Sequence, residues 1–397
     1  MSSGHDNPRL PIHLGIMSKG DPRDVRTWSG VPFAIVRRME KMVESISYLP
    51  ATPLSKARIR QEKARKGMAM LFGRRDLPQL DGVHLSRRVK PIAEAIRRES
   101  VDVVLAITVD QFVAHLETDV PIIHHSDTTF KGYENAYPEA TRLWQSTNRR
   151  GHDICKAALK KAAHTTYPSH WAANHALEHY EGRPEKITVI PYGCNLDHPP
   201  SREEALNREV DGRTCKLLFI GKDWERKGGP LVLETLRVLR ERGFDASLSV
   251  VGAKPPETDQ PITRIGFLNK QVPADLELYR SLWREATFLF MPSMAETFGA
   301  IYAEAAANGV PSVALDVGGV GDAVSDGVSG ILFQKGVDPE TCADRITSLI
   351  QNSDDYHRLV EGARNRYEEV LNWETWCCRT LGIIEDLVDG SSCGNRS

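Results

Sequence analysis

Residues 287–309 read TFLFMPSMAETFGAIYAEAAANG, an apolar run followed by a short turn and an alanine-rich run. The apolar run from Thr287 to Pro292 predicts a buried parallel strand, and the alanine-rich run from Phe298 to Asn308 predicts the helix that follows it. Glu296 therefore lies in the turn between strand and helix, and Glu304 lies inside the helix. A rise of about 1.5 Å per residue separates the two carboxylates by about 12 Å along the helix axis.

That separation exceeds the ~5 to 9.5 Å between the paired carboxyl groups of glycoside hydrolases, so a hydrolytic pair is disfavoured. It suits a long ligand that lies across the helix N-terminus. One carboxylate would accept hydroxyl hydrogen bonds at each end of the ligand, and the helix dipole would face a phosphate in the middle. A nucleotide sugar has this layout. The structural alternative is that Glu296 caps the helix and Glu304 is a solvated surface residue.

A second strand-to-helix turn, further upstream, is rich in cations and glycines. The apolar strand expected at Lys216 to Ile220 is followed by GKDWERKGGP at residues 221–230, and a helix is expected to begin near Leu231. The cations of this turn are Lys222, Arg226 and Lys227. They can clamp a diphosphate, and the glycines let the backbone come close to it. An exposed basic turn is the alternative interpretation.

Together the two turns resemble the signature of the retaining family-4 glycosyltransferases, which have the GT-B fold, and the resemblance extends over nearly the whole chain. The Glu-x7-Glu segment matches at Glu296 and Glu304, and Lys227 matches the lysine of the family's phosphate-binding turn. Many members carry arginine directly after the first glycine of that turn, where this chain has Lys222. Either Lys222 or Arg226 takes that role, and a lysine is a point charge rather than a bidentate fork.

The resemblance implies an α/β protein of the GT-B class, with two Rossmann-like doubly wound parallel-sheet domains facing an interdomain cleft. Alternating strand and helix patterns without an internal repeat favour the same class, and 397 residues suit two domains. The expected division is an acceptor-binding domain at 1–197, a polar linker at 198–213, a nucleotide-sugar domain at 214–375, and a helix and tail at 376–397 that cross back to the first domain.

The resemblance also implies where the donor binds. Glu296 would hold hydroxyls of the transferred sugar, Glu304 would hold the ribose hydroxyls, and the Phe267-Leu268 loop would meet the nucleobase. The donor-binding residues implied in this way are Gly30, Gly221, Gly252, Phe267, Leu268, Thr297, Phe298, Gly299 and Glu304. The catalytic residues implied are Lys227, Arg226, Lys222, Glu296 and His125.

Two of these residues come from the N-terminal half. Val120 to Ile123 predicts a strand that is followed by two histidines, and in the family a histidine at the end of this strand meets the transferred sugar. His125 is favoured over His124, because it precedes the Ser-Asp-Thr run directly. Gly30 stands before a helix whose first turn contains Pro32, and it would face the cleft. The structural alternative is a helix cap followed by a proline in the first turn, which would require the same residues.

The implied reaction is the retaining transfer of a hexosyl group from a UDP- or GDP-sugar to a hydroxyl of a glycan, a lipid-linked acceptor or a small molecule. Cleavage at sugar C1 puts negative charge on the diphosphate, so the reaction needs fixed cations more than a base, and neither a cofactor nor a metal is expected. Uridine, guanosine and adenosine donors stay open, because backbone groups read most of the base. A sugar-nucleotide epimerase, a phosphorylase and a non-catalytic regulatory or binding module of the same fold are the alternatives. A dinucleotide oxidoreductase is disfavoured, since no G-x-G-x-x-G follows the first strand.

Composition adds few further constraints. The chain is 41% apolar and 26% charged with a formal net charge of -2, it has a polar start, and no apolar run approaches ~18 residues, which predicts a cytoplasmic protein without a membrane span. Seven cysteines without a CxxC pair argue against a disulfide framework and a zinc knuckle. Residues 56–90 hold eleven Lys or Arg against three acids, which predicts either peripheral contact with an anionic membrane or a phosphorylated acceptor, or a solvated helical face. Phe72 is the only aromatic residue there, so nucleic acid is disfavoured as a partner.

Overall fold

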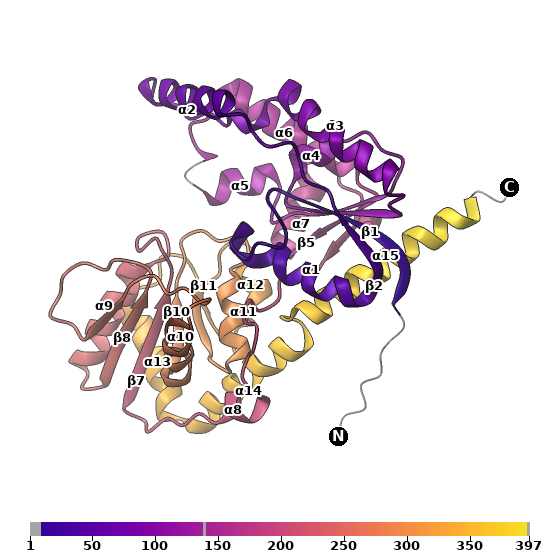
Figure 1. Cartoon of the computed structure of the whole chain (residues 1–397). Helices are drawn as coiled ribbons and strands as arrows, with labels where there is room; N and C mark the ends of the chain where they lie inside the picture. The colour runs from indigo at the N-terminus through magenta and orange to yellow at the C-terminus, as the bar shows by residue number, and fades with distance from the viewer. Residues whose placement is uncertain (1–8, 138–139, 395–397) are drawn as a thin grey trace. The chain divides into compact units, whose positions relative to one another are not determined.

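Two six-stranded sheets organise the chain in the computed structural model, which describes residues 9–137 and 140–394. One compact unit is formed by the chain up to Ile190 together with the residues from Trp376 onward, and the other by Pro191–Thr375. All strand pairs in both sheets are parallel, and helices pack against each sheet (Figure 1). The predicted α/β class with two doubly wound parallel sheets is confirmed.

The N-terminal unit alternates strands and helices along the chain. Its strands are β1 (Leu10–Ser18), β2 (Val43–Tyr48), β3 (Val103–Ile107), β4 (Ile122–His125), β5 (His164–Tyr167) and β6 (Ile187–Val189). Its helices are α1 (Val31–Met42), α2 (Lys56–Leu71), α3 (Gly82–Arg98), α4 (Asp110–His115), α5 (Phe130–Ala136), α6 (Gln145–Lys161) and α7 (His170–His179), with short 3-10 turns η1 (Thr27–Gly30), η2 (Pro78–Leu80) and η4 (Pro184–Lys186).

The C-terminal unit repeats this alternation. Its strands are β7 (Thr214–Ile220), β8 (Asp245–Val251), β9 (Ile262–Ile265), β10 (Phe288–Met291), β11 (Ser312–Leu315) and β12 (Gly330–Phe333). Its helices are α8 (Arg202–Leu206), α9 (Gly229–Glu241), α10 (Pro273–Glu285), α11 (Ala300–Ala307), α12 (Val320–Ala323), α13 (Pro339–Gln351), α14 (Ser353–Glu369) and the start of α15 (Trp373–Gly394). None of the described helices combines the length and the apolar character that a bilayer crossing requires.

Strand order fixes where a ligand can bind. The C-terminal sheet has the order β12-β11-β10-β7-β8-β9, so the direction in which the chain adds strands reverses between β7 and β10. The N-terminal sheet has the order β2-β1-β3-β4-β5-β6, and its reversal lies between β1 and β3. Open α/β sheets bind ligands beyond the carboxyl ends of their strands at such a reversal. Both motif turns found in the sequence leave β7 and β10.

The boundary between the units differs from the one predicted. The structure divides the chain after Ile190, and residues 198–213 are not a free linker but pack on the C-terminal unit. Ser201 and Glu204 form a capping box for α8. The Arg208 guanidinium donates hydrogen bonds to backbone carbonyls at the ends of α10 and α11; the acceptors are Trp283 O, Ala286 O and Asn308 O, each at 2.8 Å. The last carbonyls of a helix have no hydrogen-bond partner within the helix. Arg208 supplies donors to such carbonyls, so the polar character of this segment serves hydrogen bonding rather than flexibility.

One predicted element also changes its extent. The strand expected at Val120 to Ile123 runs instead over Ile122–His125, so both histidines lie inside β4 rather than after it. Histidine is not a typical strand residue. Strand preference depends on the contacts that a side chain makes, and β4 lies between two paired strands, β3 and β5, that can supply them. His125 finds one in Thr166 on the adjacent strand β5.

Candidate active site

The two motif turns of the C-terminal unit pack directly on each other. Gly228 has φ +79°, and a Cβ at this position would lie 2.0 Å from the carbonyl oxygen of Pro292, so only glycine allows the approach. Met294 N donates to the carbonyl of Arg226 at 2.8 Å, and the Arg226 guanidinium donates to the carbonyl of Ala295 at 3.0 Å. The turn after β7 and the turn after β10 therefore form one rigid wall at the strand reversal.

Lys227 and Glu296 make an ion pair across this wall. The Lys227 ammonium contacts a Glu296 carboxylate oxygen, and both side chains are largely buried. Gly318 supports the pair from a third loop: it has φ +57°, and a Cβ there would lie 1.8 Å from the Glu296 carbonyl. Contacts from neighbouring loops thus fix the Glu296 backbone, and Lys227 pairs with its carboxylate.

Glu304 lies in a separate pair within the same unit. The Lys270 ammonium lies 2.8 and 2.9 Å from its two carboxylate oxygens, and the Tyr279 hydroxyl donates to it at 2.6 Å. Burial raises the pKa of Tyr279 well above its usual value, and the nearby Glu304 charge adds to this effect, so the phenol stays a donor. The two glutamates therefore belong to separate ion pairs, Glu296 with Lys227 and Glu304 with Lys270.

The other predicted donor residues surround these pairs. Thr297 and Phe298 are buried at the start of α11, and Gly299 caps that helix with φ +87°. Gly252 follows β8, where a Cβ would come to 3.1 Å from the carbonyl of Gly221. Leu268 is half-buried in the loop after β9. All of these positions lie around the carboxyl ends of the C-terminal strands.

Lys222, the first cation of the basic turn, lies near an aromatic ring. It is exposed, and its ammonium lies 5.7 Å from the ring centroid of Phe267. Phe267 itself is 73% exposed. An aromatic face left open beside a cation suits a planar, anionic ligand.

In the N-terminal unit, Gly30 ends a strained turn. Trp28, Ser29 and Gly30 all have positive φ, of 42°, 57° and 82°. Gly30 is buried, and its backbone forms the N-cap of α1 without a side-chain hydrogen bond. Non-glycine residues in the left-handed region are uncommon, and they cluster at functional turns.

His125 is more deeply placed than the sequence suggests. Its Nδ1 lies 2.8 Å from the Thr166 hydroxyl, its ring packs edge-on against Trp376 with 5.1 Å between centroids, and the side chain has no exposed surface. Burial lowers the pKa of His125 to about 3, so the imidazole is neutral at pH 7. The adjacent His124 is buried as well, with Nε2 3.6 Å from an Asp110 carboxylate oxygen.

A cavity of about 810 Å³ opens at the strand reversal of the N-terminal sheet. Residues directly after the ends of β1, β3 and β4 line it, and so do side chains from α2, α3 and α6. Its polar lining includes Lys19, Lys66, Arg88, Asp110, Asp127 and Glu62. The two predicted histidines are not part of this lining; the residues that follow them, from Ser126 to Phe130, are.

Several residues of these candidate sites were not predicted from the sequence. Lys270 and Tyr279 belong to no recognisable motif. They lie in a loop and in α10, and only the fold brings them to Glu304. Asp110 did leave a signal, since it follows a fully buried strand closely, where ligand-binding side chains of α/β sheets gather. Among the residues that the structure describes, no three histidine, cysteine or acidic side chains are grouped to hold a metal ion.

Two sequence models of known families match the chain, one for each unit. "Glycosyl transferases group 1" matches residues 202–366, and "Glycosyltransferase Family 4" matches residues 58–198. With the two doubly wound sheets, these matches define the class: an enzyme of the GT-B fold. The chain belongs to the group 1 glycosyltransferases, and it is a glycosyltransferase enzyme.

Similar proteins agree with this assignment. A D-inositol 3-phosphate glycosyltransferase of Corynebacterium glutamicum is 25% identical over 290 residues, which are 68% of this chain and 67% of that protein. The structure of a sucrose-phosphate synthase from Thermosynechococcus elongatus superposes with a TM-score of 0.65 at 18% identity, over 96% of this chain and all of the other. An Anabaena protein solved in complex with UDP and glucose gives a TM-score of 0.58 at 15% identity, over 94% of this chain and all of the other. Both structures share the fold of this chain.

Proposed function

We propose that the protein is a retaining glycosyltransferase that moves a hexosyl group from a nucleoside diphosphate sugar to a hydroxyl acceptor without a metal ion or cofactor. The observation that carries the proposal is the Lys227–Glu296 pair on two interlocked turns at the strand reversal of the C-terminal sheet. A diphosphate there would replace Glu296 as the partner of Lys227. The released carboxylate would then accept hydrogen bonds from hydroxyls of the transferred sugar.

The chemistry follows from the charges of this wall. As the bond between sugar C1 and the diphosphate oxygen breaks, negative charge grows on the leaving group, and Lys227 stabilises it with Arg226 or Lys222. The backbone N–H groups at the start of α11 add to this stabilisation. The acceptor oxygen bonds to C1 on the face that the diphosphate leaves, the acceptor proton passes to the departing phosphate, and the configuration at C1 is retained.

The nucleoside end of the donor would lie beside Glu304. Ribose hydroxyls can share this carboxylate with Tyr279, which keeps its proton, while Lys270 moves toward the phosphates or the solvent. The exposed ring of Phe267, close to Lys222, offers a face for the base. The Anabaena neighbour was solved with UDP, which supports a uridine donor, and a guanosine donor remains the alternative from the sequence.

The acceptor would enter the cavity of the N-terminal unit. This cavity combines cations with carboxylates, a lining that suits a polyol carrying an anionic group. The relatives named D-inositol 3-phosphate glycosyltransferases support an acceptor of that chemistry. Because His125 is buried and has a lowered pKa, we assign it a positioning role under the cavity floor and leave the proton to the phosphate. A cytoplasmic location remains a prediction from the sequence.

A thermal-shift panel with UDP, GDP and ADP and with their hexose esters tests the donor. A nucleotide at about 100 times its dissociation constant stabilises the fold by about 2.7 kcal/mol, which a melting curve resolves. We expect one nucleotide family to raise the midpoint of the wild type and to leave a Lys227→Ala variant unshifted. If no nucleotide shifts the wild type, the donor site proposed here is wrong.

A further inference from the structure

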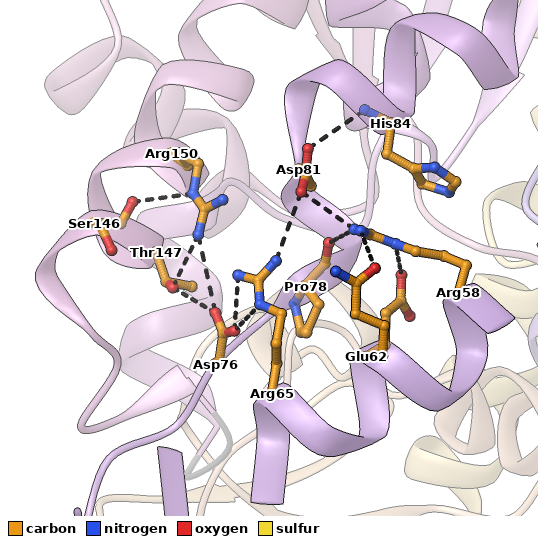
Figure 2. A network of polar contacts seen from close by, with 11 residues as sticks. Arg58, Glu62, Arg65, Asp76, Pro78, Asp81, His84, Ser146, Thr147 and Arg150 are labelled. Atoms are coloured by element: carbon orange, nitrogen blue, oxygen red, sulfur yellow. Dashed lines mark hydrogen bonds and ion pairs between the residues drawn. The ribbon is translucent and has the colours of Figure 1, made fainter. Parts of the chain in front are cut away.

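Helix α2 is held to the N-terminal unit by charges rather than by an apolar face. Arg58, Glu62 and Arg65 recur at helical spacing along its inner side (Figure 2). Arg65 lies 2.9 Å from a carboxylate oxygen of Asp76, and Arg58 lies 3.3 Å from one of Asp81. Both acids belong to the segment that connects α2 to α3. The hydrophobic effect therefore does not determine which side of α2 faces inward.

The network continues into helix α6. The Thr147 hydroxyl donates to Asp76 at 2.6 Å, and an Arg150 nitrogen lies 4.0 Å from the same carboxylate (Figure 2). Asp76 is buried, so these partners are required, and a network whose members are all satisfied holds its elements rigidly. Helix α2 is thus fixed in orientation, and its outer surface is a stable feature of the unit.

The C-terminal end of α2 presents apolar side chains to the solvent. These residues, the apolar tip, are Met68, Met70, Leu71 and Phe72, with exposed fractions of 63%, 73%, 85% and 68%. The Phe72 ring lies 6.1 Å from that of Trp144, which is itself partly exposed. Single exposed apolar residues are ordinary, but four within five positions concentrate apolar surface at one end of the helix, and exposed apolar patches mark interaction sites.

Exposed cations lie along α2 before the apolar tip and in the turn after it. The exposed basic residues of α2 and of the turn after it include Lys56, Arg60, Lys63, Lys66 and Arg74. In the part of the chain that the structure describes, none of these five forms an ion pair with an acid, in contrast to the inner arginines. Lysines are depleted in protein–protein interfaces, whereas apolar residues flanked by lysine and arginine suit the boundary between acyl chains and anionic headgroups.

We propose that the apolar tip and the exposed cations of α2 and of the turn after it dock on a lipid bilayer whose surface carries anionic headgroups. The four apolar side chains would enter the acyl boundary, and the lysines and arginines would lie among the phosphates. The same helix lines the 810 Å³ cavity with Ile59, Glu62 and Lys66, so docking would hold that cavity close to the membrane surface. The docking surface consists of residues of α2 and of the turn after it, and it does not depend on the glycosyl-transfer reaction.

Co-sedimentation with vesicles tests the docking. The full chain is mixed with vesicles of phosphatidylcholine alone or with about one-third phosphatidylglycerol, and the bound fraction is measured at low and high salt. We expect binding to the anionic vesicles only, and we expect salt to weaken it. A wild type that sediments with neither kind, or equally with both, overturns the proposal.

Paired variants identify the surface. Met70→Ser with Leu71→Ser should weaken partitioning about a hundredfold, because two exposed side chains lose their transfer into the acyl boundary. Lys63→Gln with Arg74→Gln should weaken it about 25-fold, at about fivefold for each cation. The matched control, Leu278→Ser with Val328→Ser, removes two exposed apolar residues of the other unit and should bind as the wild type does.

Folding of the variants is checked separately by circular dichroism and by melting midpoints, which should not change for exposed positions. If the serine pair binds like the wild type, the apolar tip is not the docking surface. If it loses binding only together with its fold, the headgroup and salt dependence of the wild type still decides the proposal. The proposal is also refuted if the chain does not bind vesicles but associates with itself or with another protein through α2.

Discussion

Replacement of Lys227 by methionine separates the two tasks assigned to this residue. In the structure Lys227 neutralises the largely buried carboxylate of Glu296, and in the proposed reaction it stabilises the leaving diphosphate. Methionine keeps most of the side-chain volume and removes the charge. A second variant, Lys227→Met with Glu296→Gln, removes both charges of the pair. Comparison of the two variants distinguishes structural from catalytic loss.

The single variant leaves a carboxylate without its cation, which costs about 2 kcal/mol, since both side chains retain some contact with water. For a unit of this size that corresponds to a melting midpoint about 4–8 °C lower. The double variant should recover most of this loss, because a neutral amide tolerates burial better than an unpaired charge. Activity should respond differently: loss of one group that stabilises developing charge lowers kcat by about 10²–10³-fold, and the double variant should not regain it.

Melting curves and the release of nucleoside diphosphate from the donor measure the two effects. Lys216→Met is the matched control, because Lys216 lies on the same strand β7 and pairs with Glu285 at 3.3 Å on the surface. It should change neither stability nor kcat appreciably. If Lys227→Met keeps kcat within about threefold of the wild type, the phosphate role is wrong. If the double variant regains both stability and turnover, Lys227 acts only by holding Glu296.

Other perturbations test single contacts. Glu304→Gln should weaken nucleoside diphosphate binding about tenfold by calorimetry, since a charge-assisted acceptor for the ribose is lost, and unchanged affinity would place the ribose elsewhere. Arg208→Met should lower the free energy of unfolding in urea by about 2–3 kcal/mol, because three helix-end carbonyls lose a charged donor, and an unchanged value would mean that water satisfies them. Burial lowers the pKa of His125 to about 3, against about 6.5 when unfolded, so its contribution is complete above pH 6.5 and falls by up to about 1.4 kcal/mol per unit as pH drops toward 3. His125→Asn should flatten the loss of stability between about pH 7.5 and about pH 5 in denaturant titrations, and a slope equal to that of the wild type would show that this imidazole does not resist protonation.

Sequence patterns predicted those parts of the fold that local chemistry determines. The apolar run at Phe288–Met291 has to be buried on both faces, and the glycine at 228 is demanded by the carbonyl of Pro292. The linker was misjudged because its polar residues satisfy helix-end carbonyls that only the folded unit brings near Arg208. Composition shows that a segment is polar, but it does not show which groups its polar side chains bind in the folded protein.

The candidate site was likewise predictable only where local sequence patterns mark its residues. Lys227 and Glu296 belong to two turns with strong local patterns, and strand order brings them together. Lys270 and Tyr279 were not predictable, because they meet Glu304 only through the path of the chain after β9. For His125 the pattern identified the correct strand. A parallel strand that is covered on both faces buries neighbouring side chains on either side, so His124 and His125 are both buried, and His125 packs against Trp376.

The two glutamates of residues 287–309 explain why both lysines are needed. Each carboxylate is buried, and a buried charge without a partner would destabilise the free enzyme. Lys227 and Lys270 come from different loops, and on the proposed function one pair would open for the phosphate and sugar end of a donor and the other for the ribose end. In the proposed complex, the donor would offer hydroxyls to both carboxylates and phosphates to Lys227. On the proposed function, a ligand with only one of these ends would leave the other pair closed, so the spacing of Glu296 and Glu304 would favour a complete nucleotide sugar.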